Sequence, residues 1–203
     1  MYTPAHFKEE RLDILHAAIA RIGLATLVTH GDAGLEASQL PMIVDPAAAP
    51  LGVLSGHMAR ANPLWKRAGS EALAVFLGPH AYISPSWYPS KAETGKVVPT
   101  WNYLAVHATG TIEFFDDPAQ LRAQVEQLTR THETGREPVW AVGDAPDAYI
   151  AQLLRAIVGF RLTITRLEGQ WKMSQNKSAT ELDGVVQGLA RDGADDILAI
   201  MKP

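Results

Sequence analysis

Two clusters of polar side chains have the residue types and spacing to bind an anion or a polar ring. The first, residues 56–63, reads GHMARANP and carries His57, Arg60 and Asn62 just ahead of a predicted short helix over residues 63–68. Free backbone amides and a partial positive charge at a helix start, next to an arginine, favour a phosphate-like anion. A solvated Arg60 and an Asn62 that only caps the helix are the simpler interpretation of the same residues.

The second cluster, residues 172–177, reads KMSQNK and contributes Lys172, Ser174 and Gln175. It lies where the last predicted strand meets a helix that Ser178 is expected to cap, so cations and backbone amides point outward together there. Each of these side chains, taken alone, is more commonly solvated than functional. Together with residues 56–63, they give two separated sites of cations, amides and hydroxyls.

Between the two clusters lies an aromatic stretch, residues 82–103, which is rich in proline. Pro85, Pro89 and Pro99 lack a backbone donor and force extended or turn geometry, so residues 85–99 are predicted to form a loop. Aromatic side chains in a loop have two interpretations: they anchor the loop on its own core, or they form a wall for a flat, partly polar partner. The aromatic members are Tyr82, Trp87, Tyr88, Trp101 and Tyr103.

These parts fit a flat, redox-active ring that carries a phosphate, with the aromatic stretch covering the ring. Amide side chains such as Asn102, Gln175 and Asn176 would bond the polar edge of the ring. Arg60 with a lysine would hold the phosphate. The chain has no phosphate-loop, dinucleotide-binding or G-x-S-x-G motif, and its seven histidines are dispersed, so we predict no metal site and name no catalytic residue.

The composition is that of a globular protein with a sizeable core. The chain has 203 residues, of which 47% are hydrophobic and 20% charged, and a net charge of −4. This charge, together with scattered basic residues, argues against a dedicated nucleic-acid-binding protein. The absence of cysteine excludes disulfides, iron–sulfur clusters and cysteine catalysis. The N-terminus has no apolar signal region and no window approaches ~20 apolar residues, so we expect a cytoplasmic protein without a membrane segment.

Residues 1–203 are predicted to form one domain, mainly β with peripheral helices (α+β), in which an antiparallel barrel positions both clusters. Residues 1–115 supply an N-terminal helix and most strands, residues 116–158 a helical insertion, and residues 159–203 a final hairpin and C-terminal helices. The strands are predicted at residues 24–30, 35–44, 51–55, 72–77, 81–84, 101–110, 111–115, 160–165 and 170–175, with turns at 31–34, 78–80 and 168–169. The helices are predicted at residues 7–22, 63–68, 117–133, 146–157 and 195–201, and after Ser178.

Five blocks occur in order along the chain: GHMARANP (56–63), GPHAYISPSWYPSK (78–91), VPTWNYLAVHATG (98–110), AIVGF (156–160) and WKMSQNKS (171–178). Together they closely resemble the PaiB-type family of FMN-binding negative transcriptional regulators. The resemblance runs from the N-terminal MYTPAHF almost to the end of the chain. It implies an FMN-binding split β-barrel related to pyridoxamine-phosphate oxidases and flavin reductases. It also implies a homodimer with two flavins at the subunit interface, each held by residues of both chains.

Carried over by position, the resemblance implies a set of residues that bind FMN. The phosphate end would be held by His57, Arg60 and Asn62. The ring or the ribityl chain would be approached by Ser84, Trp87, Lys91, Thr100, Trp101 and Asn102. The site would be closed from the final hairpin by Lys172, Ser174 and Gln175.

Two functions agree with these residues. The resemblance implies a cytoplasmic, dimeric FMN-binding protein that represses gene expression, directly or through a partner, and direct DNA binding is its weakest element because no basic recognition helix is present. The alternative is a flavin reductase or oxidase in which FMN relays electrons between NAD(P)H and a small acceptor. Hydride transfer to a flavin needs no protein acid or base, so the lack of a catalytic residue does not count against an enzyme. A barrel that holds haem, another flat cofactor or nothing is a third alternative.

Overall fold

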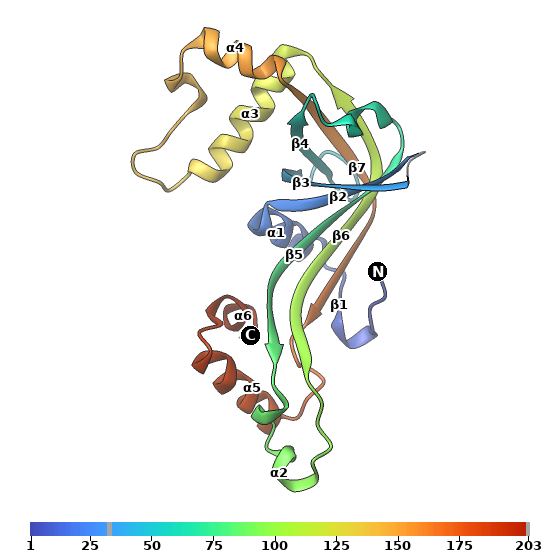
Figure 1. The fold of residues 1–203 in the computed structure, drawn as a ribbon, viewed down its shortest axis with the longest axis vertical. Helices are drawn as coiled ribbons and strands as arrows, with labels where there is room; N and C mark the ends of the chain where they lie inside the picture. Colours follow the sequence, from blue (N-terminus) through green and yellow to red (C-terminus); the bar gives the residue numbers. More distant parts are fainter. Residues whose placement is uncertain (32–33, 202–203) are drawn as a thin grey trace. The chain divides into compact units, whose positions relative to one another are not determined.

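The computed structural model describes residues 1–31 and 34–201, and its strands form one antiparallel sheet (Figure 1). The strand order is β1-β7-β4-β3-β2-β5-β6, and β7 also pairs with β6, so the sheet closes on itself as a barrel. This closure confirms the predicted antiparallel barrel. The strands are β1 (Lys8–Glu9), β2 (Leu24–Gly31), β3 (Gly34–Asp45), β4 (Val53–Ala59), β5 (Glu71–Ile83), β6 (Thr100–Phe115) and β7 (Ile157–Lys172).

The strands alternate between buried and more exposed side chains, as a sheet with one covered face requires. Leu27, Leu54 and Phe76, which come from β2, β4 and β5, are fully buried. Gly56 on β4 makes room for the ring of Phe160, because a Cβ at Gly56 would lie 2.7 Å from that ring. The barrel interior is therefore a packed hydrophobic core.

The chain divides into two compact units. Unit 1 comprises residues 1–11, 77–106 and 168–203, and unit 2 comprises residues 12–76 and 107–167. The long strands β5, β6 and β7 contribute residues to both units. Within residues 1–31 and 34–201, no helix is long and apolar enough to span a bilayer.

Unit 2 contains the predicted helical insertion, formed by α3 (Pro118–Glu133) and α4 (Asp147–Arg155) with a short 3-10 helix, η4 (Val142–Asp144), between them. Asp117 caps α3 as predicted, because its carboxylate accepts the N–H of Gln120 at 2.9 Å. The two helices share a small hydrophobic core of Leu121, Val142, Ile150 and Leu154. Unit 2 also holds α1 (Leu12–Ile22) and the 3-10 helix η2 (Pro63–Arg67).

Unit 1 contains the short helices of the aromatic stretch, η3 (Pro85–Trp87) and α2 (Ser90–Thr94), followed in the chain by the C-terminal helices α5 (Ala179–Arg191) and α6 (Asp195–Met201). The predicted cap of α5 is confirmed, since the Ser178 hydroxyl accepts the N–H of Glu181 at 3.3 Å. A first 3-10 helix, η1 (Ala5–Phe7), precedes β1.

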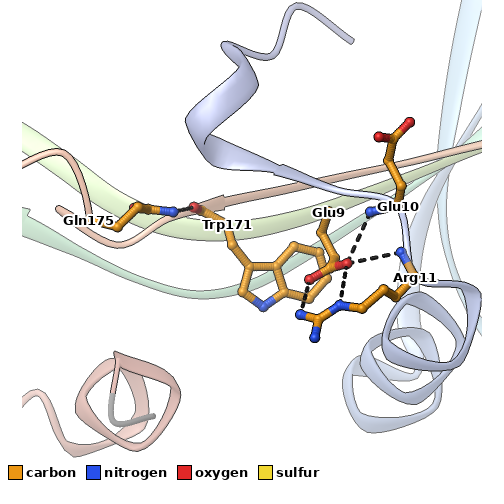
Figure 2. Close-up of polar contacts among 5 residues, drawn as sticks. All are labelled: Glu9, Glu10, Arg11, Trp171 and Gln175. Atoms are coloured by element: carbon orange, nitrogen blue, oxygen red, sulfur yellow. Dashed lines mark hydrogen bonds and ion pairs between the residues drawn. The ribbon is translucent and has the colours of Figure 1, made fainter.

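The prediction of a helix from residue 7 to residue 22 is wrong at its start. Residues 5–9 form η1 and β1, and α1 begins only at Leu12. The Glu9 carboxylate accepts the backbone N–H groups of Glu10 and Arg11 at 3.0 and 2.9 Å and the side chain of Arg11 (Figure 2). A side chain that bonds the next two backbone amides favours a turn over a helix, which explains the late start.

Two predicted breaks in the sheet are also wrong. The hairpin expected at residues 168–169 does not form, because Gly169 and Gln170 pair with Glu9 and Lys8 of β1 and β7 continues to Lys172. The turn expected at residues 78–80 is likewise absent from the continuous strand β5. The register of β5 with β2 covers Ala72 to Val75 only, so Pro79 removes no N–H from that ladder.

Three smaller differences concern strand boundaries. The strand expected at residues 51–55 is β4, which continues through His57 to Ala59 and pairs with β7. The runs at 101–110 and 111–115 are one strand, β6. The β2–β3 hairpin is confirmed, with pairing up to Gly31 and Gly34, whereas Asp32 and Ala33 of its predicted turn lie outside the described residues.

Candidate functional site

A pocket in unit 1 brings together four of the residues that the resemblance assigns to FMN, Thr100, Asn102, Lys172 and Ser174. Its volume is about 200 Å³. Thr100 and Asn102 come from β6, Lys172 ends β7, and Ser174 follows it in the segment that leads to α5. The remaining lining residues are Phe7, Tyr88, Val98, Asn176 and Lys177.

The pocket is cationic. The Lys172 ammonium donates a hydrogen bond of 2.5 Å to the Thr100 hydroxyl, and burial lowers the pKa of Lys172 below its ordinary value. Lys177 is a second cation in the lining, and the Glu181 carboxylate of α5 pairs with it at 4.0 Å. A partly desolvated ammonium such as that of Lys172 attracts an anion or the electron-rich edge of a ligand.

Asn102 is fixed at the base of this pocket by two neighbours. Its side chain is fully buried, its Oδ1 accepts from the Ser174 hydroxyl at 3.0 Å, and its Nδ2 lies 3.6 Å from the sulfur of Met201. Ser174 has a φ of 61°, a left-handed backbone conformation that non-glycine residues rarely adopt. Such strain persists where the surrounding structure enforces it, and it is concentrated at functional sites.

Tyr88 contributes a hydroxyl that lacks a partner. Its side chain is only 2% exposed, and its Oη makes no hydrogen bond within the described residues. Burial, together with the charge of Glu181, raises the pKa of Tyr88, so the phenol stays protonated and able to donate. The Lys177 ammonium lies 4.5 Å from the centre of the Tyr88 ring. An unsatisfied buried hydroxyl costs about 1–3 kcal/mol, and a ligand that accepts a hydrogen bond from it would recover this free energy.

The set of FMN-binding residues carried over from the resemblance did not include Tyr88 and Lys177. Both lie in the blocks that carry the family resemblance, residues 78–91 and 171–178, so a signal was available. The missing hydrogen bond of Tyr88 depends on the packing around it, which the sequence does not display.

The aromatic stretch is anchored on α5 through Trp87. A Cβ on Gly188 would lie 2.2 Å from the Trp87 indole, and one on Gly184 would lie 2.1 Å from the Trp87 carbonyl oxygen. Ser90 of α2 donates a 2.5 Å hydrogen bond to Glu181 of α5. Trp87 thus packs as the anchored-loop interpretation expects, on a face of α5 that two glycines leave flat.

Trp101 takes a different position, on an exposed face of β5 and β6. Its ring centre lies 6.1 Å from that of His80 and 6.0 Å from that of Tyr82. Trp101 is 52% exposed and Tyr82 48% exposed. We call these three side chains the exposed aromatic face.

The other predicted residues of unit 1 form local hydrogen bonds outside the pocket lining. Ser84 accepts the N–H of Ser86 at 3.2 Å, and the Lys91 ammonium donates to the Ser86 hydroxyl at 2.9 Å. The Gln175 amide donates to the Trp171 carbonyl at 2.5 Å (Figure 2) and accepts the N–H of Met173 at 2.7 Å. Their assignment to the flavin stays a prediction.

The predicted phosphate end lies in unit 2, where two of its three side chains are engaged. The Arg60 guanidinium donates to the carbonyls of Arg155 and Ile157 at 2.9 and 3.1 Å and to the Asp116 carboxylate at 3.3 Å. Asn62 caps η2 as predicted, because its Oδ1 accepts the N–H of Leu64 at 3.0 Å.

The third of these residues, His57, has a buried Nδ1 that makes no hydrogen bond within the described residues. Burial lowers the pKa of His57, so the imidazole is held neutral. The phosphate assignment of His57, Arg60 and Asn62 stays a prediction.

Comparison with known sequences identifies relatives along the whole chain. The family model described as "Putative FMN-binding domain" matches residues 1–166. An uncharacterized protein of Emericella nidulans is 34% identical over 96% of this chain and 92% of its own length. The protease synthase and sporulation protein PAI 2 of Bacillus subtilis is 28% identical over 95% of this chain and 90% of its own length. These matches confirm the predicted resemblance and FMN as the cofactor.

Two solved structures share the fold. The FAD and heme binding protein from Mycobacterium smegmatis has a TM-score of 0.61 at 16% identity, covering 87% of this chain and 78% of that one. The flavocytochrome Anf3 from Azotobacter vinelandii has a TM-score of 0.59 at 12% identity, covering 84% of this chain and 72% of that one. Together with the closed sheet, they confirm the predicted split β-barrel.

Proposed function

The chain belongs to the PaiB-type family of FMN-binding domains, and on this premise we propose that it is a cytoplasmic homodimer in which FMN controls a negative regulator of gene expression. When bound, FMN supplies hydride and one-electron transfer. The observation that carries the proposal is the unit 1 pocket, whose lining combines Lys172, Lys177 and Tyr88 with its unpartnered hydroxyl.

The residues of this pocket suit the polar edge of a flavin ring, which offers carbonyl oxygens and ring nitrogens as acceptors. Lys172 and Tyr88 would each donate a hydrogen bond to that edge, and Asn102 would present its fixed amide beside them. These donors fit the chemistry of the group. The chain's own residues therefore orient the ring and set the charge beside it, which is the protein's part in flavin chemistry.

A second copy of the chain would complete the site. The pocket of about 200 Å³ is smaller than the ~300–1,000 Å³ of typical small-molecule sites, so it holds only part of an FMN molecule. The exposed aromatic face of His80, Tyr82 and Trp101 has the composition of an interface, since aromatic residues are enriched there. Leu77 of β5 and Val98, just before β6, are 54% and 73% exposed and add apolar surface to these segments.

The regulatory part of the proposal is supported by the relatives. PAI 2 of Bacillus subtilis carries protease synthesis and sporulation in its name, and the family resemblance is to negative transcriptional regulators. A net charge of −4 disfavours direct contact with DNA phosphates, so we propose that repression acts through a protein partner. The partner of such a regulator acts on transcription, and we therefore propose that the protein is located in the cytoplasm with that partner.

A complementation experiment tests the flavin-dependent regulatory role. Transcript levels are compared in a deletion strain, in the same strain carrying the wild-type gene, and in the strain carrying Lys172→Met, with protein abundance checked in each. We expect wild type to restore repression and Lys172→Met, which binds FMN more weakly, to fail at equal abundance. Full repression by Lys172→Met would overturn flavin control. Rapid anaerobic bleaching of bound FMN by NADPH, with no transcript that responds to deletion, would instead support the oxidoreductase alternative.

A further inference from the structure

A large groove in unit 2 shares no lining residue with the unit 1 pocket. Its volume is about 780 Å³, and it lies along the start of α3 and the end of α4. This volume is within the ~300–1,000 Å³ range of pockets that bind small molecules. The lining residues are Arg60, Asp116, Pro118, Ala119, Leu121, Arg122, Ala151, Leu154 and Arg155.

The groove has an aliphatic floor and narrow side chains on both helices. Leu121 and Leu154 belong to the buried core that α3 and α4 share, so they are held in place by packing. Ala119 on α3 and Ala151 on α4 are exposed and small. None of the groove's lining residues is aromatic, so nothing there stacks on a flat ring.

The rim of the groove is cationic. The lining contains three arginines and one carboxylate, that of Asp116, which is paired with Arg60 at 3.3 Å. Arg122 is paired with Glu126 at 3.0 Å and with Asp147 at 3.4 Å. Arg155 at the end of α4 has no hydrogen bond or ion pair through its side chain within residues 1–31 and 34–201. One guanidinium is therefore available for a ligand.

We propose that this groove binds a small anion with an aliphatic body, of the class of medium-chain carboxylates. The hydrocarbon part would cover the leucine floor between Ala119 and Ala151, and the carboxylate would meet Arg155 at the rim. The flavin phosphate shares the anionic headgroup chemistry, but the groove offers no aromatic surface for the flavin ring. The groove and the unit 1 pocket have no lining residue in common, so the proposal does not depend on flavin binding in that pocket.

Calorimetric titration of the purified full chain tests this site, with octanoate as the probe and 1-octanol as its uncharged match. We expect saturable octanoate binding and weaker binding of octanol. Ala151→Trp fills the groove and should weaken octanoate binding at least tenfold, and Ala119→Trp does the same from the other wall. Arg155→Glu should weaken it by about 1.4-fold to about 5-fold, because an exposed charge pair contributes ~0.2–1 kcal/mol. Arg21→Glu, an exposed arginine on α1 outside the groove, is the matched control and should bind as wild type does.

Flavin content and circular dichroism of every variant distinguish loss of the site from loss of the fold. A folded Ala151→Trp or Ala119→Trp protein that keeps its FMN and loses octanoate supports the proposal. Absence of octanoate binding by wild type, or unchanged binding in both tryptophan variants, would overturn it. Loss of FMN together with octanoate in folded variants would also overturn it, since the groove would then belong to the flavin.

Discussion

Replacement of Tyr88 by phenylalanine should change the stability of the protein and its affinity for FMN in opposite directions. The substitution removes one oxygen atom from a side chain that is 2% exposed and keeps the ring that packs beside Lys177. In the flavin-free protein that oxygen is buried without a partner, which costs about 1–3 kcal/mol. The free energy of unfolding of Tyr88→Phe should therefore exceed that of wild type by up to this amount, and the variant should unfold at a higher denaturant concentration.

The flavin complex should respond in the opposite way, because the variant cannot donate to the ring. A hydrogen bond contributes about 0.5–1.5 kcal/mol, so the FMN dissociation constant should rise by about 2-fold to about 13-fold. Urea unfolding of the flavin-free proteins and fluorescence titration with FMN measure the two effects. Tyr149→Phe is the matched control, since this tyrosine of α4 is exposed and lies outside the pocket lining. A less stable flavin-free Tyr88→Phe that binds FMN as tightly as wild type would refute the reasoning.

Three further predictions concern the same unit. Burial lowers the folded-state pKa of Lys172 below 10.5, so the unfolded chain binds more protons and the flavin-free protein should gain stability as pH rises between the two values. FMN affinity should fall over the same pH range, because the ammonium donor is lost. Unfolding and FMN titration at several pH values measure both effects, and Lys172→Met should lack both contributions of this group. Gly188→Ala places a methyl group against the Trp87 indole and should destabilise the fold by about 1–3 kcal/mol in urea unfolding, whereas Gln187→Ala on the exposed side of α5 should stay within about 0.5 kcal/mol. Trp101→Lys should leave the subunit folded but shift it from dimer to monomer in sedimentation velocity, and a Trp101→Lys dimer as tight as wild type would contradict the interface proposal.

Local signals in the sequence predicted three of the helix starts correctly, whereas the start of α1 was placed too early. Asn62, Asp117 and Ser178 each accept a backbone N–H within the next three residues, so their role depends only on nearby chain. The alternation of apolar and polar residues in the long strands was also a local signal, because it repeats every two residues. The barrel followed from these local patterns, and the family resemblance supplied its closure.

The errors arose where distant segments decide the structure. Gly169 looks like a turn residue, but its partner in the sheet is Glu9, about 160 positions away in the chain. The resemblance linked the blocks that contain Thr100, Asn102, Lys172 and Ser174, and the structure places these four residues in the lining of one pocket. The unpartnered hydroxyl of Tyr88 and the pairing of Arg60 with Asp116 result from tertiary packing, which the periodicity of the sequence does not predict.

The most direct test of the flavin site is the affinity of wild type and Lys172→Met for FMN and for riboflavin, which lacks the phosphate. A hydrogen bond from a charged donor contributes about 1.5–3 kcal/mol, so Lys172→Met should weaken the binding of both flavins by the same factor, between about 13-fold and about 150-fold. Unchanged affinity for both would contradict the assignment of the pocket to the flavin. A loss confined to FMN would contradict its assignment to the ring.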